Sequence, residues 1–543
     1  MDIKSLLFKG MLAVTALVQV SCSTQETKSE SKERPNILFI FSDDHTTAAI
    51  SSYGGIYKDI APTPNIDRIA NEGIRFNNLY SVNAICGPSR AAILTGKHSH
   101  INGFYKNESG GDFNNTQQTF PKLLQANGYQ TAVIGKWHLG SLPTGFDYFK
   151  VMINHGGQGT YYDAKYVDSN GDTIKATKYS TYEVGDDALS WLDKKRDKNK
   201  PFMLMCQFKA PHRPWDPAPE YANLWADIDM PVPATFNDTW EGKPAAQENW
   251  MRIDKNLNPR DLKMKPPREN MTPKELRAYY KLGNQNEYWS PSDTLTGQAL
   301  KNWKFQGYIK DYLRVVRGVD DQIGRLLKYL DDTKLADNTI VIYSSDQGFF
   351  IGEHGMFDKR FMYEESTKMP FVMRFPNHLK KGVNRNIMSE IDIAPTLLDF
   401  AGIEIPSDIQ GKSFVNVAEG KDNNWRDSYY YHYYEYPWWH HIQPHYGIRT
   451  NKYKLIHFYY SMDVWELYDL EKDPDELDNI YGKEGYEVIT EDLKKQLKDL
   501  QREYKMNKSL EELRAMTDAR IHRVYGNQEV EIKEKKNSNK KKK

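Results

Sequence analysis

Four short runs of consecutive apolar residues recur along the chain, and each is followed directly by polar side chains. They span residues 36–41, 131–134, 202–208 and 339–343. A continuous apolar run of this length is typical of a strand that is buried on both faces, as in a parallel sheet. Because helical patterns separate the runs, the sequence predicts an α/β fold with a large, mixed but mostly parallel sheet between helices.

Two of the intervening segments have clear helical patterns. Residues 307–330 carry apolar residues at helical spacing, namely Leu313, Val316, Val319, Ile323, Leu326 and Leu327. Residues 64–70 begin with Pro64, which suits the first turn of a helix, and Thr63 is placed to cap it. We expect both helices to cover faces of the sheet.

Polar side chains gather at the ends of the four apolar runs. Asp43 and Asp44 follow the first run, residues 136–138 the second, His212 the third, and Asp346 with Gln347 the fourth. In open α/β sheets, ligands bind outside the carboxyl ends of the strands. The pattern therefore predicts that these side chains share one site.

The pattern changes beyond residue 420. Residues 429–436 are densely aromatic, residues 445–450 and 453–458 alternate as strands do, and residues 491–504 have helical spacing. We expect a main domain over residues 35–420 and a smaller C-terminal α+β domain with an antiparallel sheet over residues 421–525. The basic tail, residues 526–543, is expected to be disordered.

The N-terminus has the features of an export signal. Lys4 and Lys9 precede an apolar stretch, residues 11–20, that is too short to span a membrane and leads to Cys22. We interpret residues 1–22 as a lipoprotein signal, Cys22 as the lipidated residue and residues 23–34 as a polar tether. Because Gln19 departs from the usual aliphatic residue, cleavage by an ordinary signal peptidase stays an alternative.

This interpretation predicts an exported protein of a Gram-negative bacterium, periplasmic or anchored in the outer membrane. Contact with a membrane is expected only through the lipid anchor. The formal net charge is 0, and the tail from Lys533 to Lys543 contributes +6, so the rest of the chain carries about −6. That balance gives no general polyanion-binding surface, and no nucleic-acid partner is expected. With Cys22 lipidated, only Cys86 and Cys206 remain, and Cys206 is expected to be a small core residue.

The segment Cys86-Gly87-Pro88-Ser89-Arg90, continued to Leu94-Thr95-Gly96, is the most distinctive motif of the chain. It resembles the signature of the formylglycine sulfatases, C-x-P-S-R-x-x-x-L-T-G, at every position. The resemblance implies an alkaline-phosphatase-like fold and a maturation enzyme that oxidises Cys86 to formylglycine, whose hydrate attacks sulfur. Arg90, one helical turn on, would hold that hydrate. The alternative is an incidental cysteine at a helix start.

Asp43, Asp44, Asp346 and Gln347 supply three carboxylates and one amide oxygen, with no histidine or cysteine among them. Oxygen ligands of this kind suit Ca²⁺. The resemblance implies the same ion, since the family holds calcium with matching pairs after two strands. Taken alone, Asp43 and Asp44 would also fit a solvated turn.

Three further elements match the sulfatase family. In Gly135-Lys136-Trp137-His138-Leu139-Gly140, the resemblance implies that Lys136 contacts sulfate and His138 contacts the formylglycine. In Pro211-His212-Arg213-Pro214, it implies that His212 is the general acid, although a single histidine after a strand is often structural. Lys359 would bridge the sulfate and the leaving oxygen.

The stretches 346–366 and 445–456 resemble bacterial exported N-acetylglucosamine-6-O-sulfatases, including mucin-desulfating enzymes. The implied partner is a sulfated saccharide with a 6-O-sulfate on N-acetylglucosamine, in host glycans such as mucin, keratan sulfate or heparan sulfate fragments. His445 and Arg449 are candidates for the rim that reads the sugar, although His445 would equally fit a strand residue packed on Tyr446. A second group either contacts the sugar or pairs internally to hold Lys359: His354, Asp358 and Arg360.

Three alternatives stay open. The same machinery would serve 6-sulfated galactose, N-acetylgalactosamine or another sulfated polysaccharide, and only substrate profiling separates these. A phosphonate or phosphate monoester hydrolase would share the fold, but zinc phosphatases of the superfamily use Ser or Thr nucleophiles and His-rich paired metal sites. A glycan-binding lipoprotein in which Cys86 is never converted would not need His212 and Lys359 so placed.

Overall fold

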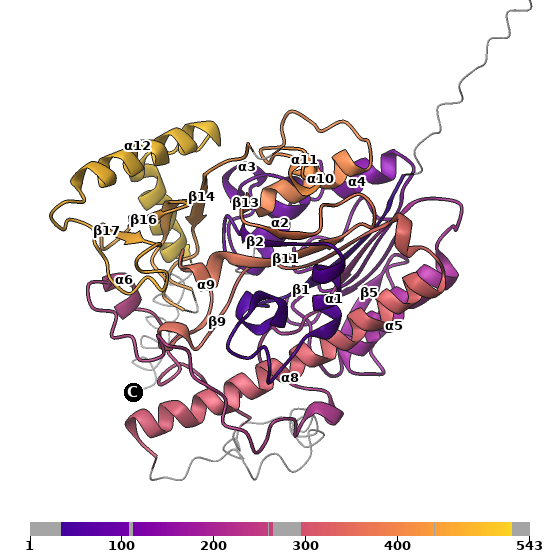
Figure 1. The fold of residues 1–543 in the computed structure, drawn as a ribbon, viewed down its shortest axis with the longest axis horizontal. Coiled ribbons are helices and arrows are strands. Elements are labelled where there is room, and N and C mark those ends of the chain that lie inside the picture. Colours follow the sequence, from indigo (N-terminus) through magenta and orange to yellow (C-terminus); the bar gives the residue numbers. More distant parts are fainter. Residues whose placement is uncertain are drawn as a thin grey trace, which may run out of the picture. The chain divides into compact units, whose positions relative to one another are not determined.

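The computed structural model describes residues 34–107, 112–258, 260–263, 295–422, 424–438 and 440–523 (Figure 1). The predicted signal with Cys22, the tether up to residue 33 and the basic tail lie outside these residues. The described residues belong to one compact unit that begins at Arg34. Among them, no helix is both long enough and apolar enough to cross a membrane.

The main structural element is an 11-stranded mixed sheet. Its spatial order is β12 (Gly382–Asn384), β2 (Ile74–Tyr80), β11 (Lys368–Arg374), β8 (Thr339–Ser345), β1 (Asn36–Ser42), β7 (Phe202–Gln207), β3 (Gln130–Gly135), β4 (Tyr148–Met152), β5 (Lys165–Asp168) and β6 (Thr173–Lys175), with β13 (Met388–Ser389) paired to β2. The four predicted runs form β1, β3, β7 and β8, which are neighbours and run parallel. Strands β11, β5 and β6 pair antiparallel, so the expectation of a mixed, mostly parallel sheet is confirmed.

Helices cover both faces of this sheet, as the double apolar character of the strands requires. In β1, Leu38 and Ile40 pack into one core with α1 (Pro64–Glu72), α5 (Ser180–Ser190) and α8 (Gly297–Asp332). Ile37 and Phe39 point the other way, into a core with α2 (Cys86–Thr95), α4 (Phe120–Ala126) and α10 (Ile393–Phe400). Figure 1 shows the two helical layers on either side of the strands.

Two details of the helices differ from the prediction. Helix α8 begins at Gly297, ten residues before the predicted start. Helix α1 begins at Pro64 as predicted, but the Thr63 side chain makes no capping hydrogen bond. Instead Asp320 of α8 accepts hydrogen bonds from the N–H groups of Asn65 and Ile66, at 3.1 and 2.9 Å. A cap supplied from another helix is not visible in local sequence.

The C-terminal part forms a separate four-stranded antiparallel sheet. It contains β14 (Ser428–Tyr433), β15 (His445–Thr450), β16 (Tyr453–Phe458) and β17 (Val464–Asp469), followed by α12 (Glu487–Glu503). The two predicted strands have the observed bounds, and α12 begins four residues earlier than predicted. Aromatic residues alternate along β14: Tyr431 packs toward the main domain beside Phe350, whereas Tyr430 packs with Leu493 of α12.

Several short elements lie between these parts. They are α3 (Ser99–Asn102), α6 (Pro244–Gln247), the hairpin of β9 (Phe350–Ile351) and β10 (Phe357–Asp358), α9 (Glu364–Thr367) and α11 (Val415–Ala418). The β9–β10 hairpin places the segment around Lys359 beside the ends of β1 and β8.

Candidate active site

Cys86 is the first residue of α2, a helix whose ten residues are all buried. The following residue, Gly87, donates its N–H to Asn107 Oδ1 at 2.9 Å. A Cβ at Gly87 would lie 2.6 Å from the Phe104 ring and 2.7 Å from Asn107 Oδ1, so this position has room only for glycine. Burial raises the pKa of the Cys86 thiol well above its ordinary value, and Asp43 raises it further despite Lys136 and Lys359. An unmodified Cys86 is therefore protonated at neutral pH and a poor nucleophile.

The predicted metal ligands meet because their strands are adjacent. In the β1–β8 register, Ser42 pairs with Ser345, so Asp43 and Asp346 leave the sheet side by side. One carboxylate oxygen from each of Asp43, Asp44 and Asp346 lies within 4.8 Å of the others. The Asp44 N–H donates to Asp346 Oδ1 at 3.0 Å, with Asp44 in the left-handed region at a φ of 68°.

The chemistry of this cluster fits a divalent cation. Burial raises the pKa of Asp44 to about 6, and burial together with Asp43 raises the pKa of Asp346 well above its ordinary value. Asp43 Oδ1 and Gln347 Oε1 are buried without hydrogen-bond partners. Crowded carboxylates with unsatisfied oxygens need a positive charge, and the all-oxygen donor set suits Ca²⁺.

Three cations surround the carboxylates. Arg90 contacts Asp346 Oδ2 through Nε and Nη2, at 3.2 and 3.1 Å, and its Nη1 donates to Gln207 Oε1 at 2.9 Å. Lys136 forms an ion pair with Asp43, and Lys359 lies 2.6 Å from Asp44 Oδ1. The structure thus brings together all three cations named from the sequence, with Arg90 seated on a carboxylate of the cluster.

His212 lies at the same centre. One of its ring nitrogens, Cys86 Sγ and an Asp43 carboxylate oxygen all lie within 4.8 Å of one another. Its Nδ1–H donates to the Arg213 carbonyl at 2.8 Å, which leaves Nε2 as the atom 3.8 Å from Asp44 Oδ2. Burial, reinforced by Lys136, holds the pKa of His212 well below its usual value. His138 is also buried, with φ at 56° and Nδ1 without a partner.

Asp358 and Arg360 flank Lys359 in a backbone of unusual conformation. Their φ values are 82° and 105°, a region that non-glycine residues rarely adopt and that concentrates at functional sites. Asp358 is paired with Arg360, and His440 Nε2 lies 3.1 Å from Asp358 Oδ2. Burial would raise the pKa of Asp358, but His440, Lys359 and Arg360 hold it well below the ordinary value.

Two residues named for the sugar have buried partners. His354 is fully buried, and its Nδ1 lies 2.7 Å from Asp238 Oδ2. Arg449 is 7% exposed, 3.3 Å from Glu364 and stacked over the Tyr80 ring. Both side chains have partners of their own within the protein, and their contact with the sugar stays a prediction.

His445 packs in an aromatic environment within the C-terminal sheet. Its ring lies among Tyr431, Tyr433 and Phe458 rather than on Tyr446, and its Nδ1 donates to the Gln443 carbonyl at 2.7 Å. Its Nε2 is buried without a partner. Contact of His445 with the sugar stays a prediction.

Two residues of the centre were missed by the sequence reasoning. Lys209 Nζ lies 3.4 Å from His212 Nδ1 and donates to the Arg213 carbonyl at 3.0 Å, and burial lowers its pKa to about 7. Its place three residues before His212, at the end of β7, was the available signal. His440, the partner of Asp358, lies in an aromatic loop with no recognisable spacing.

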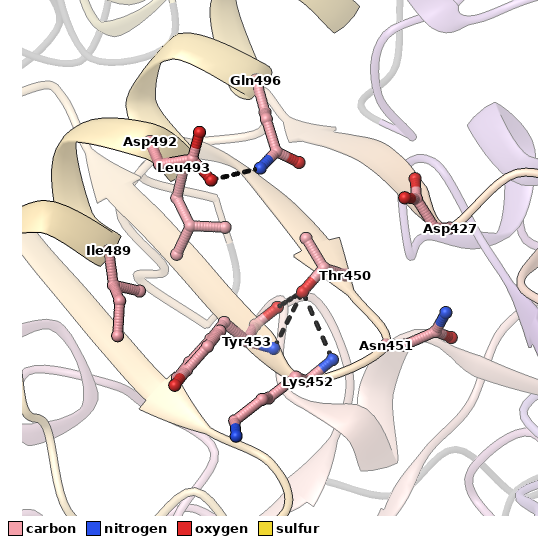
Figure 2. Close-up of a pocket in the computed structure, with 9 residues that line it drawn as sticks. All are labelled: Asp427, Thr450, Asn451, Lys452, Tyr453, Ile489, Asp492, Leu493 and Gln496. Carbon is pink, nitrogen blue, oxygen red and sulfur yellow. Dashed lines mark hydrogen bonds between the residues drawn. The ribbon is translucent and has the colours of Figure 1, made fainter.

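A hollow of 270 Å³ in the C-terminal domain lies elsewhere in the fold (Figure 2). Its walls are the β15–β16 turn, where Thr450 Oγ1 accepts hydrogen bonds from two backbone N–H groups, and the α12 residues Ile489, Asp492, Leu493 and Gln496. None of the predicted catalytic or metal-binding residues lines it.

Comparison with known proteins supports a single family. A family model described as sulfatase matches residues 35–403, and one described as N-sulphoglucosamine sulphohydrolase, C-terminal, matches residues 352–503. An N-acetylglucosamine-6-O-sulfatase from Bacteroides thetaiotaomicron is 48% identical over 92% of this chain and 91% of its own length.

Solved structures with the same fold as this chain support this family. A protein in complex with its substrate D-glucosamine-2-N,6-O-disulfate matches with a TM-score of 0.83 and 48% identity, over 88% of this chain and 100% of that one. A phosphonate monoester hydrolase from Silicibacter pomeroyi shares the fold at 19% identity, with a TM-score of 0.64 over 88% of this chain and 96% of its own. Since the sulfatase model spans well over half of the 543 residues and the Bacteroides relative is nearly half identical, the chain belongs to the sulfatase family.

Proposed function

We propose that the protein hydrolyses the 6-O-sulfate of N-acetylglucosamine in sulfated saccharides. The observation that carries the proposal is the meeting of Cys86 Sγ, the Asp43 carboxylate and the His212 imidazole within 4.8 Å of one another. The choice of sugar is supported by the 48% identical relative, an N-acetylglucosamine-6-O-sulfatase, which aligns over 92% of the chain.

The proposed nucleophile derives from Cys86. When a maturation enzyme has oxidised Cys86 to formylglycine, the hydrated aldehyde supplies an oxygen nucleophile for sulfur. The protonated thiol of the unmodified residue does not supply one. Gly87, held by Asn107, fixes the start of α2, and with it the direction in which residue 86 faces the centre.

The proposed metal ligands are Asp43, Asp44, Asp346 and Gln347. A Ca²⁺ ion bound there would neutralise sulfate charge. Arg90 keeps Asp346 in place through two contacts, so that its carboxylate stays turned toward the other ligands. Lys136 and Lys359, which contact Asp43 and Asp44, are placed to orient the sulfuryl oxygens and to balance the charge that develops on them.

His212 is the proposed proton donor to the leaving alkoxide. Because its Nδ1–H is committed to the Arg213 carbonyl, Nε2 is the atom that can take up a proton at the centre. The low pKa of His212 leaves Nε2 without a proton in the free site, and the negative charge of a bound sulfate ester would favour its protonation. Protonation at Nε2 gives an acid within reach of the leaving oxygen. His138 is the proposed contact for the hydrated residue 86.

Export and anchoring are part of the proposal. The support is the sequence of residues 1–22, with Cys22 as the lipidated residue, and the expected location is the periplasm or the outer membrane. Labelled fatty acid supplied to producing cells should enter the protein and not a Cys22→Ala variant. Recovery of unlabelled wild-type protein without residues 1–22 would instead favour ordinary signal cleavage.

The experiment that tests the function is sulfate release from a panel of sulfated monosaccharides, together with the intact mass of the Cys86 peptide. We expect turnover of N-acetylglucosamine 6-sulfate by protein with a formylglycine mass. If protein with formylglycine at residue 86 acts on 6-sulfated galactose but not on N-acetylglucosamine 6-sulfate, the proposed sulfatase activity stands and the proposed substrate is wrong. Converted protein that hydrolyses phosphonate esters and no sulfate ester would contradict the proposal.

A further inference from the structure

Three buried polar side chains beside the centre have atoms without hydrogen-bond partners. They are Glu435 Oε1, the Tyr433 hydroxyl and Arg360 Nε, on residues that are 1%, 0% and 6% exposed. Most buried polar atoms in proteins have a partner, and leaving one unpaired is costly. These three atoms beside the centre leave one acceptor and two donors available to a ligand.

The three side chains are neighbours, although they come from different parts of the chain. Tyr433 ends β14, Glu435 lies two residues later, and Arg360 follows the β9–β10 hairpin. Burial raises the pKa of Tyr433, and the nearby Glu435 raises it further, whereas Arg360 lowers it. Tyr431, two residues before Tyr433 on the same face of β14, donates its hydroxyl to the Arg360 carbonyl at 2.5 Å, which holds Arg360 against this strand.

The two carboxylate oxygens of Glu435 differ in their hydrogen bonding. The Asn107 N–H donates to its Oε2 at 2.9 Å, and Asn107 Oδ1 accepts the N–H of Gly87 at 2.9 Å. One carboxylate oxygen is therefore tied, through Asn107, to the residue next to Cys86, and the other is free. Arg520 donates to the Tyr436 carbonyl at 2.6 Å, which fixes the backbone on one side of Glu435.

We propose that the end of β14 forms a sugar-binding subsite, in which Glu435 Oε1 accepts and the Tyr433 hydroxyl donates hydrogen bonds to hydroxyl or amide groups of the sulfated ring. Arg360 Nε is a second donor in this subsite. The inference rests on the proposed function, in that the sulfate is carried by a sugar. It assigns specificity to the C-terminal domain and sulfate chemistry to the main domain.

The variant Glu435→Gln tests the free oxygen without disturbing the tied one. Because Asn107 N–H needs an acceptor, the amide oxygen takes the place of Oε2, and an NH₂ donor replaces the acceptor at Oε1. We expect kcat/KM for N-acetylglucosamine 6-sulfate to fall about 10- to 100-fold relative to kcat/KM for an aryl sulfate, which has no ring hydroxyls. Equal losses on both substrates would show that Glu435 only positions Cys86 and would overturn the subsite.

Tyr433→Phe and Tyr429→Phe form a matched pair. Both tyrosines are buried on the same face of β14 with unpartnered hydroxyls, but Tyr429 stacks on Tyr80. We expect Tyr433→Phe to lower the ratio of sugar to aryl sulfate turnover about 3- to 10-fold and Tyr429→Phe to leave that ratio unchanged. The same change in both variants would contradict the inference.

A binding measurement separates failure of the inference from failure of the proposed function. Desulfated monosaccharides, including N-acetylglucosamine and galactose, are titrated into wild-type protein and Glu435→Gln by calorimetry. Weaker binding of any of them to the variant supports the subsite even if N-acetylglucosamine 6-sulfate is not a substrate. Equal binding to both proteins, or no binding to wild type at millimolar concentrations, overturns it.

Discussion

Two clusters of buried charge lie in this protein, and they are built on opposite principles. The central cluster contains Asp43, Asp44 and Asp346 with Arg90, Lys136 and Lys359. The second, which we call the interface cluster, contains Glu364, Glu476, Arg449 and Lys454, and it joins α9 to the C-terminal sheet. The central cluster is almost completely shielded from solvent, and in the interface cluster Lys454 and Glu476 are fully buried while the Glu364 side chain is 12% exposed.

In the interface cluster, opposite charges are matched. Lys454 lies 2.7 Å from Glu476 and 3.0 Å from Glu364, and Arg449 lies 3.3 Å from Glu364. Burial would raise the pKa of Glu364, but Lys454 and Arg449 hold it well below its ordinary value. Lys454 is held by ion pairs alone: its Nζ and Glu476 Oε1 have no hydrogen-bond partner, and burial raises the pKa of Glu476 to about 7.

In the central cluster, like charges are crowded. Three carboxylates meet within 4.8 Å, the pKa of Asp346 is raised by burial and by Asp43, and Asp43 Oδ1 has no hydrogen-bond partner. Such an arrangement costs stability unless something else binds there. The two clusters therefore differ in geometry: the central carboxylates converge within 4.8 Å of one another, as the ligands of a cation do, whereas the acids of the interface cluster are bridged by Lys454.

The largest expected effect is that of Cys86→Ala. Without an oxygen nucleophile at residue 86, turnover of sulfate esters should fall by about four orders of magnitude or more, while the saccharide still binds. Sulfate release and calorimetric titration of substrate measure the two properties. Turnover within about tenfold of wild type would show that residue 86 is not the nucleophile.

Removal of the bound metal should have the second-largest effect, and this effect should arise in the central cluster and not in the interface cluster. With the ion chelated, the central carboxylates repel one another, so both activity and melting temperature should fall, activity by about a thousandfold. Re-addition of Ca²⁺ should restore both. If neither property responds to chelator, the central cluster does not hold an exchangeable cation.

His212→Gln should lower activity by about a hundredfold, because the acid for the leaving oxygen is lost. The loss should be smaller for aryl sulfates with acidic phenols, whose leaving groups need no proton. A steady-state comparison of both substrate types provides the measurement. An equal loss on both would assign His212 to sulfate binding instead of proton transfer.

The smallest effect on activity is expected in the interface cluster. Lys454→Met leaves Glu364 and Glu476 buried beside each other, which should cost about 3–5 kcal/mol of unfolding free energy. Activity per folded molecule should be retained, since Lys454 contacts no residue of the central cluster. Denaturant unfolding and active-site titration check both parts, and a specific loss of kcat in fully folded protein would remove the distinction between the clusters.

Much of the main domain could be predicted from sequence because its buried strands are continuous apolar runs. Because ligands bind at the carboxyl ends of the strands in open α/β sheets, the sequence also predicted that four polar side chains lie at one edge of the sheet. These are Asp43, Asp346, Lys136 and His212, and the prediction needed no knowledge of strand order. The motif at Cys86 identified the family.

The remaining contacts depend on distant segments meeting. The α1 cap comes from Asp320 and the partner of Asp358 from His440, and no local pattern marks either. The partner of Arg449, Glu364, was not predicted for the same reason, since it lies 85 residues away in the sequence. Alternation along a strand shows on which face of the sheet a side chain lies, but not which charged residue of another segment it contacts there.

The burial of Cys86 has a consequence for the order of events in biosynthesis. The side chain is 1% exposed at the start of a helix that is itself enclosed, so another enzyme has no access to it once the domain has folded. If Cys86 is converted as proposed, its oxidation would therefore have to precede folding, while the segment is still an extended peptide. Oxidation and folding would then compete in time, and the fraction of converted molecules in a preparation would report how long the newly made chain stayed unfolded.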